Sequence, residues 1–284
     1  MSDDRAPSSS GALRVLHVSD LHFGRPAVPE QIEAIEGAIA SERFDVVAIS
    51  GDLSQRARAG EFQRAAVFLR DARRFSQTIV VPGNHDVHWW RAPLGLGDRE
   101  QVYETYKAYV SPDLEPVLRV QGATFVGLNT SHGVTRRTLT WNVRDISILG
   151  DLTRPQLEYA RAVFAGARKD DARIVVMHHN PVKGELSQRH GLKHTPKILG
   201  AFAEMGVDLV LCGHDHQEAI HYVEHTRKGT IVSTAGTVSN RSRGGRPSSY
   251  NVISVSPTDI TVITHVWNAD ARNFTSGSTK CFER

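Results

Sequence analysis

The chain is poor in cysteine, in long apolar runs and in excess charge, and each shortage excludes a class of protein. Two cysteines among 284 residues cannot build a disulfide framework or a four-thiolate zinc site, which indicates a reducing compartment. No stretch approaches the roughly 18 uninterrupted apolar residues of a membrane span, and no signal-peptide pattern opens the chain. The 34 basic and 31 acidic residues leave a formal charge of only +3, without a basic stripe for nucleic acid. We therefore expect a cytoplasmic protein with no membrane span and no dedicated nucleic-acid module.

The composition, with 40% hydrophobic and 23% charged residues, is that of a globular protein able to bury a deep core. Its first residues are polar and serine-rich. We therefore expect residues 1–12 to be a disordered tail and residues 13–284 to form a single domain.

Apolar runs alternate with helical periodicity along most of the chain. Buried strands are predicted at 13–19, 45–50, 78–81, 173–177 and 207–212, and helices at 30–40, 60–75, 99–110, from 155 onward and at 198–205. Two further strands at 117–121 and 123–128 are predicted to form a hairpin, and strands at 230–233, 250–255 and 260–267 follow. Repeated strand-helix units predict parallel strands and the α/β class.

Histidine is abundant, and six of the 14 histidines fall in short polar clusters at the carboxyl ends of the predicted strands. These clusters contain Asp20, His22, Asp52, Asn84, His85, Asp86, His178, His179, His214 and His216. The carboxyl ends of strands in an open α/β sheet border the ligand crevice, so we expect one common site. Carboxylate, imidazole and amide ligands without thiolate suit divalent Mn, Fe or Zn. Two ions sharing one carboxylate would use a set that is too large for one tetrahedral ion.

The sequence strings in these clusters are unlikely to arise by chance. A Gly-His-x-His string, as at 213–216, is expected by chance only about 0.05 times in this composition, and Gly-Asn-His-Asp at 83–86 far less often. Capping or solvated loop residues are the alternative interpretation of the set, and the order of the strings makes it the weaker one.

The same strings, Asp-x-His at 20–22, Gly-Asp at 51–52, Gly-Asn-His-Asp at 83–86, His178 and Gly-His-Asp-His at 213–216, resemble the complete signature of the calcineurin-like metallophosphoesterases. Ser-Asp-Leu-His-Phe-Gly at 19–24, His-His-Asn-Pro at 178–181 and Ala-Gly-Thr at 235–237 further resemble bacterial class III cyclic-nucleotide phosphodiesterases. The resemblance covers residues 13–267. It implies a four-layer α/β/β/α sandwich.

The resemblance also implies the ligands of two divalent metal ions. One ion is expected on Asp20, His22, Asp52 and His216, and the other on Asp52, Asn84, His178 and His214. A hydroxide bridging the two ions would then attack phosphorus. His85 would stabilise the transition state or protonate the leaving oxygen, with Asp86 orienting its ring.

Residues on the substrate side are less firmly specified. His179 either supports its neighbour or replaces it as a ligand, and we prefer His178 because it directly ends the strand. Arg241 and Arg243, in the glycine-rich loop 240–248, are expected to clamp a phosphate, with a solvated loop as the alternative. Segment 183–197 is either a substrate-facing lid or an ordinary loop, and 129–148 a surface loop or a homodimer contact.

The favoured function is a binuclear metal-dependent phosphodiesterase acting on a small phosphorylated substrate, in particular a 3′,5′-cyclic nucleotide. Hydrolysis of another phosphoester or pyrophosphate, such as a nucleotide-linked lipid precursor or a phosphomonoester, is the alternative within the same fold. A noncatalytic scaffold is the alternative from another class. It is disfavoured because every ligand position and His85 carry chemically competent residues.

Overall fold

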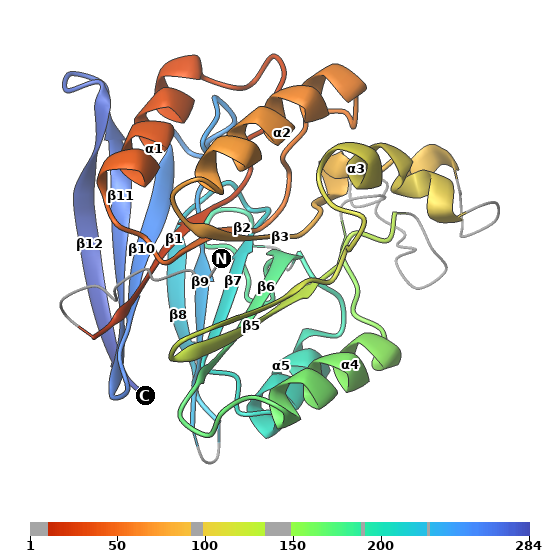
Figure 1. Cartoon of the computed structure of the whole chain (residues 1–284), viewed down its shortest axis with the longest axis vertical. Coiled ribbons are helices and arrows are strands. Elements are labelled where there is room, and N and C mark those ends of the chain that lie inside the picture. Colours follow the sequence, from red (N-terminus) through yellow and green to blue (C-terminus); the bar gives the residue numbers. More distant parts are fainter. Residues whose placement is uncertain (1–10, 92–98, 134–148, 189–190, 226–227) are drawn as a thin grey trace, which may run out of the picture.

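The computed structural model describes residues 11–91, 99–133, 149–188, 191–225 and 228–284, in which the strands form two six-stranded sheets (Figure 1). The strands of the first sheet are β1 (Leu13–Val18), β2 (Val46–Ile49), β3 (Gln77–Val80), β10 (Ser249–Val255), β11 (Asp259–Asn268) and β12 (Asn273–Glu283). They lie in the order β12-β11-β10-β1-β2-β3. β1, β2 and β3 are parallel, as predicted, and the last three strands extend the sheet in antiparallel pairs.

The second sheet is built around four parallel strands. Its members are β4 (Val117–Val120), β5 (Ala123–Leu128), β6 (Ala172–His179), β7 (Leu209–Gly213), β8 (Ala219–Val223) and β9 (Thr230–Thr234), in the order β4-β5-β6-β7-β9-β8. β4 and β5 form the predicted antiparallel hairpin, and β8 pairs antiparallel with β9 at the other edge.

Helices cover the outer faces of both sheets. The helices are α1 (Pro29–Ser41), α2 (Ala59–Ala72), α3 (Glu104–Tyr109), α4 (Arg154–Ala165) and α5 (Thr195–Glu204), with short 3₁₀ turns at η1 (Asn84–Asp86), η2 (Trp89–Arg91) and η4 (Arg99–Val102). Figure 1 shows α1 and α2 on one side of the paired sheets and α4 and α5 on the other. One apolar cluster lies between the sheets, and one more lies under each helix layer. The molecule is therefore the four-layer α/β/β/α sandwich.

The apolar periodicity of the sequence accounts for these layers. On α1, Ile32, Ile35 and Ile39 follow helical spacing and are all buried against the first sheet. Burying one such side chain stabilises the fold by about 2 kcal/mol. The central strands are buried on both faces, so they are continuous apolar runs.

The structure differs from the sequence prediction at four places. The predicted helix 99–110 is the 3₁₀ turn η4 followed by the six-residue helix α3. The predicted helix 60–75 ends at Ala72, and Phe75 is 48% exposed because the chain turns there to enter β3. β8 was not predicted, and neither was β12, an edge strand whose side chains are mostly exposed and polar. The division into a tail and one domain stays a prediction. Among the described residues, no helix is both long and apolar enough to cross a membrane.

Candidate metal centre

Seven predicted ligands converge where the two sheets meet. They follow or end the strands β1 (Asp20, His22), β2 (Asp52), β3 (Asn84), β6 (His178) and β7 (His214, His216). Parallel strands present their carboxyl ends at one edge, which explains why residues up to 196 positions apart in the chain meet.

The backbone is strained at most of these positions. Five of the seven residues have left-handed φ values between 45° and 74°: Asp20, His22, Asp52, His214 and His216. A non-glycine residue in this region costs about 1–3 kcal/mol and persists only when its surroundings hold it. Main-chain hydrogen bonds stabilise this conformation. The amide of Asp20 donates to the carbonyl of Gly51, and the amide of His22 donates to the carbonyl of Asp52.

Two glycines of the sequence strings are required by close approach. A Cβ on Gly83 would lie 2.1 Å from Oδ1 of Asp52, and one on Gly213 would lie 1.9 Å from Oγ of Ser19. Any side chain there would displace the carboxylate or the start of the β1 loop. The glycines therefore allow the loops to pack around the ligands.

The first cluster consists of Asp20, His22, Asp52 and His216, all buried. Nε2 of His216 lies 3.0 Å from Oδ1 of Asp20 and 3.1 Å from Nε2 of His22. Nε2 of His22 lies 3.6 Å from Oδ1 of Asp20 and 3.8 Å from Oδ2 of Asp52. Four donor atoms thus surround one point.

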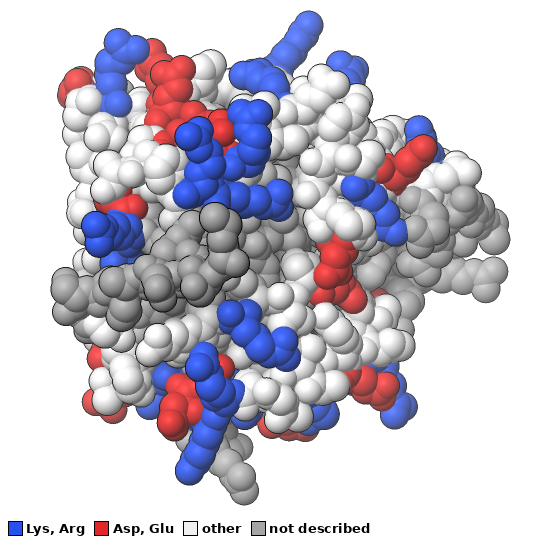
Figure 2. All heavy atoms as spheres, viewed as in Figure 1, with Lys and Arg blue, Asp and Glu red and all other residues white. Residues whose placement is uncertain are grey.

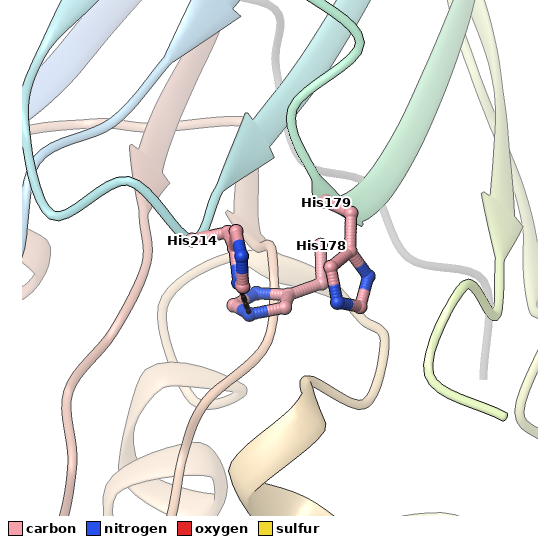
Figure 3. A group of neighbouring side chains, drawn as sticks. All are labelled: His178, His179 and His214. Carbon is pink, nitrogen blue, oxygen red and sulfur yellow. Dashed lines mark hydrogen bonds between the residues drawn. The ribbon is translucent and has the colours of Figure 1, made fainter. Parts of the chain in front are cut away.

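The second cluster shares Asp52 with the first. Its Oδ2 lies 3.4 Å from Nε2 of His178, which is in turn 3.1 Å from Oδ1 of Asn84. Nδ1 of His214 lies 3.0 Å from the same Asn84 oxygen and 3.3 Å from Nε2 of His178. Figure 3 shows the ring of His214 close to that of His178 and nearly perpendicular to it, with His179 beside them. One carboxylate oxygen therefore faces both clusters.

Outer contacts fix which ring nitrogen faces each cluster. Nδ1 of His178 donates to the carbonyl of Ser50 at 2.8 Å, and Nδ1 of His216 donates to the carbonyl of Arg241 at 3.1 Å. Both Nε2 atoms are therefore directed into the clusters, where each could bind a metal ion in its deprotonated form.

The electrostatics agree with a site that holds cations. Burial lowers the pKa of His214 to about 3, which keeps it neutral. Burial also disfavours the charged form of His178, but the carboxylate of Asp52 outweighs it and raises the pKa of His178 to about 9. Oδ1 of Asp20 is buried and accepts no hydrogen bond from the residues that the structure describes. The buried carboxylates therefore favour positive charge at this place, and a divalent ion that displaced the proton of His178 would satisfy them in its stead.

His85 lies beside the first cluster, with its ring centroid 4.9 Å from that of His22. Its amide donates to Oδ1 of Asp52 at 2.8 Å. Its Nδ1 donates to the carbonyl of Gln55 at 2.8 Å, and its Nε2 accepts from the guanidinium of Arg241 at 3.1 Å.

The expectation that Asp86 orients the ring of His85 is wrong. The Asp86 carboxylate instead accepts the amides of Leu53, Ser54 and Gly83 at 2.7–3.1 Å, and the hydroxyl of Ser54. Burial and the charge of Asp52 raise its pKa to about 7, against the opposing effect of these donors. Asp86 ties the β2 loop to the β3 loop, and the carbonyl of Gln55 orients the ring.

The predicted substrate residues have different surroundings. Nδ1 of His179 lies 2.7 Å from Oγ1 of Thr130, and its ring centroid is 4.5 Å from that of His214. Arg241 reaches the site through both its guanidinium and its carbonyl. Arg243 is turned toward Asp215, 3.6 Å away, so the two arginines do not form a clamp.

Sequence reasoning missed Gln55 and Ser50, whose main-chain carbonyls accept from Nδ1 of His85 and of His178, a contact that any residue type could make. The predicted lid at 183–197 includes the start of α5, and its residues 189–190 lie outside the described residues. Most of the loop 129–148, from 134 onward, also lies outside them.

The comparisons with known proteins agree with this fold. The purple acid phosphatase PPD1 of yellow lupin (Lupinus luteus) seeds superposes with a TM-score of 0.67 at 12% identity, over 98% of this chain. PhoD superposes with a TM-score of 0.66 at 11% identity, over 98% of this chain and 71% of PhoD. GAP50, the anchor in the inner membrane complex of Plasmodium, gives 0.61 at 14% identity, over 96% of this chain and 89% of GAP50. At these identities the likeness establishes the fold alone.

This chain spans only 55% of the lupin protein. No curated protein has a matching sequence. The profile of the calcineurin-like phosphoesterases matches residues 13–218, which is most of the chain. The protein therefore belongs to the calcineurin-like phosphoesterase family, a family of metal-dependent phosphoester hydrolases.

Proposed function

We propose that this protein is a binuclear metal-dependent phosphodiesterase acting on small nucleotide phosphodiesters, with 3′,5′-cyclic nucleotides as the simplest substrates. The observation that carries the proposal is the position of Asp52, whose Oδ2 lies 3.8 Å from Nε2 of His22 and 3.4 Å from Nε2 of His178. A carboxylate that faces two clusters of metal-binding side chains is suited to bridge two ions.

The residues divide between the two ions as the sequence strings imply. Asp20, His22, Asp52 and His216 would hold one, and Asp52, Asn84, His178 and His214 the other. Divalent Mn, Fe or Zn bound there would lower the pKa of a water molecule and neutralise phosphoryl charge. Of the two adjacent histidines, His178 is the proposed ligand because its Nε2 faces both Asp52 and Asn84, whereas Nδ1 of His179 contacts Thr130.

His85 and Arg241 supply the remaining functional groups. Arg241 holds a permanent positive charge beside the first cluster and can donate to a phosphoryl oxygen. His85 is fixed through Nδ1, and once Arg241 has turned to a phosphoryl oxygen, a proton taken up at Nε2 would pass to the leaving alkoxide. The carbonyl of Gln55 fixes the ring angle that this transfer requires.

The proposed substrate is small. Lys and Arg are interspersed with Asp and Glu on the face in Figure 2, which shows no basic stripe of the length that a nucleic acid needs. Resemblance of strings 19–24 and 178–181 to cyclic-nucleotide enzymes supports a diester over a monoester. A cytoplasmic location remains a prediction, supported by Cys212 and Cys281 being free thiols.

Hydrolysis assays test the proposal directly. Chelator-treated protein is assayed on bis(p-nitrophenyl) phosphate, p-nitrophenyl phosphate and 3′,5′-cyclic AMP, with Mn²⁺ restored or withheld. We expect metal-dependent turnover of the diester and the cyclic nucleotide, and little turnover of the monoester. Turnover of the model diester alone would discard the cyclic nucleotide, preferred turnover of the monoester would indicate a phosphatase, and no turnover with any metal would favour the scaffold.

A further inference from the structure

A pocket of about 310 Å³ lies beside the metal centre on the side of His85. It is lined by Arg25, Pro26, Gln55, Arg56, Arg58 and Glu61. Three of these six residues are arginines, although the chain as a whole is nearly neutral. The pocket is thus a local concentration of positive charge.

The pocket and the metal centre share structural elements. The loop after β1 provides Asp20 and His22 to the centre and Arg25 to the pocket, and the loop after β2 provides Asp52 to the centre and Arg56 to the pocket. The carbonyl of Pro26 also accepts the amide of Asn240, next to Arg241. Both sites are therefore held by the same loops.

Gln55 forms the wall between them. Its carbonyl accepts from Nδ1 of His85 at 2.8 Å, and its side-chain Oε1 accepts from the guanidinium of Arg241 at 3.1 Å. The same residue lines the pocket. The pocket and the side chains of the metal centre are therefore separated by a single residue.

The three arginines are available for a ligand. Within the described parts of the chain, no carboxylate forms an ion pair with Arg25, Arg56 or Arg58, and all three are exposed. The one acid of the pocket, Glu61, is already engaged, because its Oε2 accepts the amides of Arg56 and Arg58. Arg243 and Arg246 of the nearby loop are by contrast paired with acids.

We propose that this pocket binds a second anionic group of the substrate, a phosphate, while the scissile phosphodiester lies at the metal centre. Guanidinium groups bind phosphate through paired charge-assisted hydrogen bonds, and three of them around one cavity suit a dianion. The inference rests on the proposed function and narrows it to phosphodiesters that carry a further phosphate. A simple cyclic nucleotide, with one charged group, leaves the pocket unfilled.

Two chromogenic diesters that differ by one phosphate test the inference. Thymidine 5′-(p-nitrophenyl phosphate) and its 3′-phosphorylated derivative are compared on the Mn²⁺-loaded protein. We expect kcat/KM to be about tenfold higher for the phosphorylated compound, the size of one charge-assisted contact. The variant Arg56→Gln/Arg58→Gln should lose this preference and keep its turnover of bis(p-nitrophenyl) phosphate.

The variant Arg43→Gln/Arg119→Gln removes the same charge from distant exposed positions and should keep the preference. Equal kcat/KM for both diesters in the unmodified protein, or an unchanged preference in the pocket variant, would overturn the inference. Loss of the preference in both double variants would also overturn it, since the effect would then follow net charge.

Binding measurements separate this inference from the proposed function. Calorimetry compares thymidine 3′,5′-bisphosphate with thymidine 5′-monophosphate on the unmodified protein and the pocket variant. Tighter binding of the bisphosphate, lost in the variant, supports the pocket even if no diester is hydrolysed. Equal affinities in a protein that hydrolyses bis(p-nitrophenyl) phosphate would refute the pocket and leave the phosphodiesterase in place.

Discussion

The two oxygens of Asp52 have separate partners: Oδ1 accepts the amide of His85 at 2.8 Å, whereas Oδ2 lies 3.4 Å from Nε2 of His178. The carboxylate thus fixes the main chain at His85 with one oxygen and faces the proposed metal ligands with the other. Because Asp52 makes both contacts, we expect the position of His85 to depend on whether metal ions are bound at the two clusters.

The first prediction follows from this double contact. Asp52→Ala should lose both metal ions and reduce turnover of bis(p-nitrophenyl) phosphate by about a thousandfold or more, because a bridging ligand serves both ions. Elemental analysis after gel filtration measures the metal content. The exposed Asp270→Ala is the matched control and should retain both ions. Two tightly bound ions in Asp52→Ala would contradict the assignment of this residue.

His85 is predicted to act on the substrate without holding a metal. His85→Ala should leave the metal content unchanged and lower kcat by about 10²- to 10³-fold, the range of a positioned proton donor. Steady-state kinetics on bis(p-nitrophenyl) phosphate give kcat and KM separately. If kcat is unchanged, His85 only braces the loop through its contact with Gln55.

Asp86 is predicted to act on stability. Asp86→Ala removes the acceptor of three buried amides, from Leu53, Ser54 and Gly83, which should lower the free energy of unfolding by about 3 kcal/mol or more. Urea denaturation of the metal-free protein measures this loss. An unchanged free energy of unfolding in Asp86→Ala would contradict this structural role.

The sequence predicted which side chains converge better than it predicted the contacts that support them, for a physical reason. The side-chain types of Asp20 and His178 indicate metal ligands directly from the sequence. Because parallel strands end at the same edge of a sheet, their positions after strands also predict that they meet. The orientation of His85 depends on a main-chain carbonyl of another loop, which any residue could provide at position 55. The pairing of Arg243 with Asp215 likewise depends on how two loops meet.

The fold shows the same division. β1 and β2 were predicted because their apolar runs are buried on both faces. β12 was missed because an edge strand contacts neighbours mainly on one side and needs few apolar residues.

The last prediction concerns the dependence of stability on pH. His17 lies on β1 with Nε2 2.9 Å from Oγ of Ser50, and burial lowers its pKa to about 3, although the charge of Asp20 opposes this. In the unfolded chain, His17 takes up a proton near pH 6.5, whereas in the folded protein it stays neutral down to about pH 3. Stability should therefore fall as the pH is lowered through this window, by about 1.4 kcal/mol per pH unit for this one proton.

His17→Gln removes that titrating group and keeps a polar partner for Ser50. Between pH 6 and pH 4.5, the unfolding free energy of the metal-free variant should fall less steeply than that of the unmodified protein. Urea midpoints taken at several pH values measure both slopes under the same conditions. Because all other titrating groups are common to the two proteins, parallel curves would show that His17 takes up its proton equally in the folded and unfolded chains.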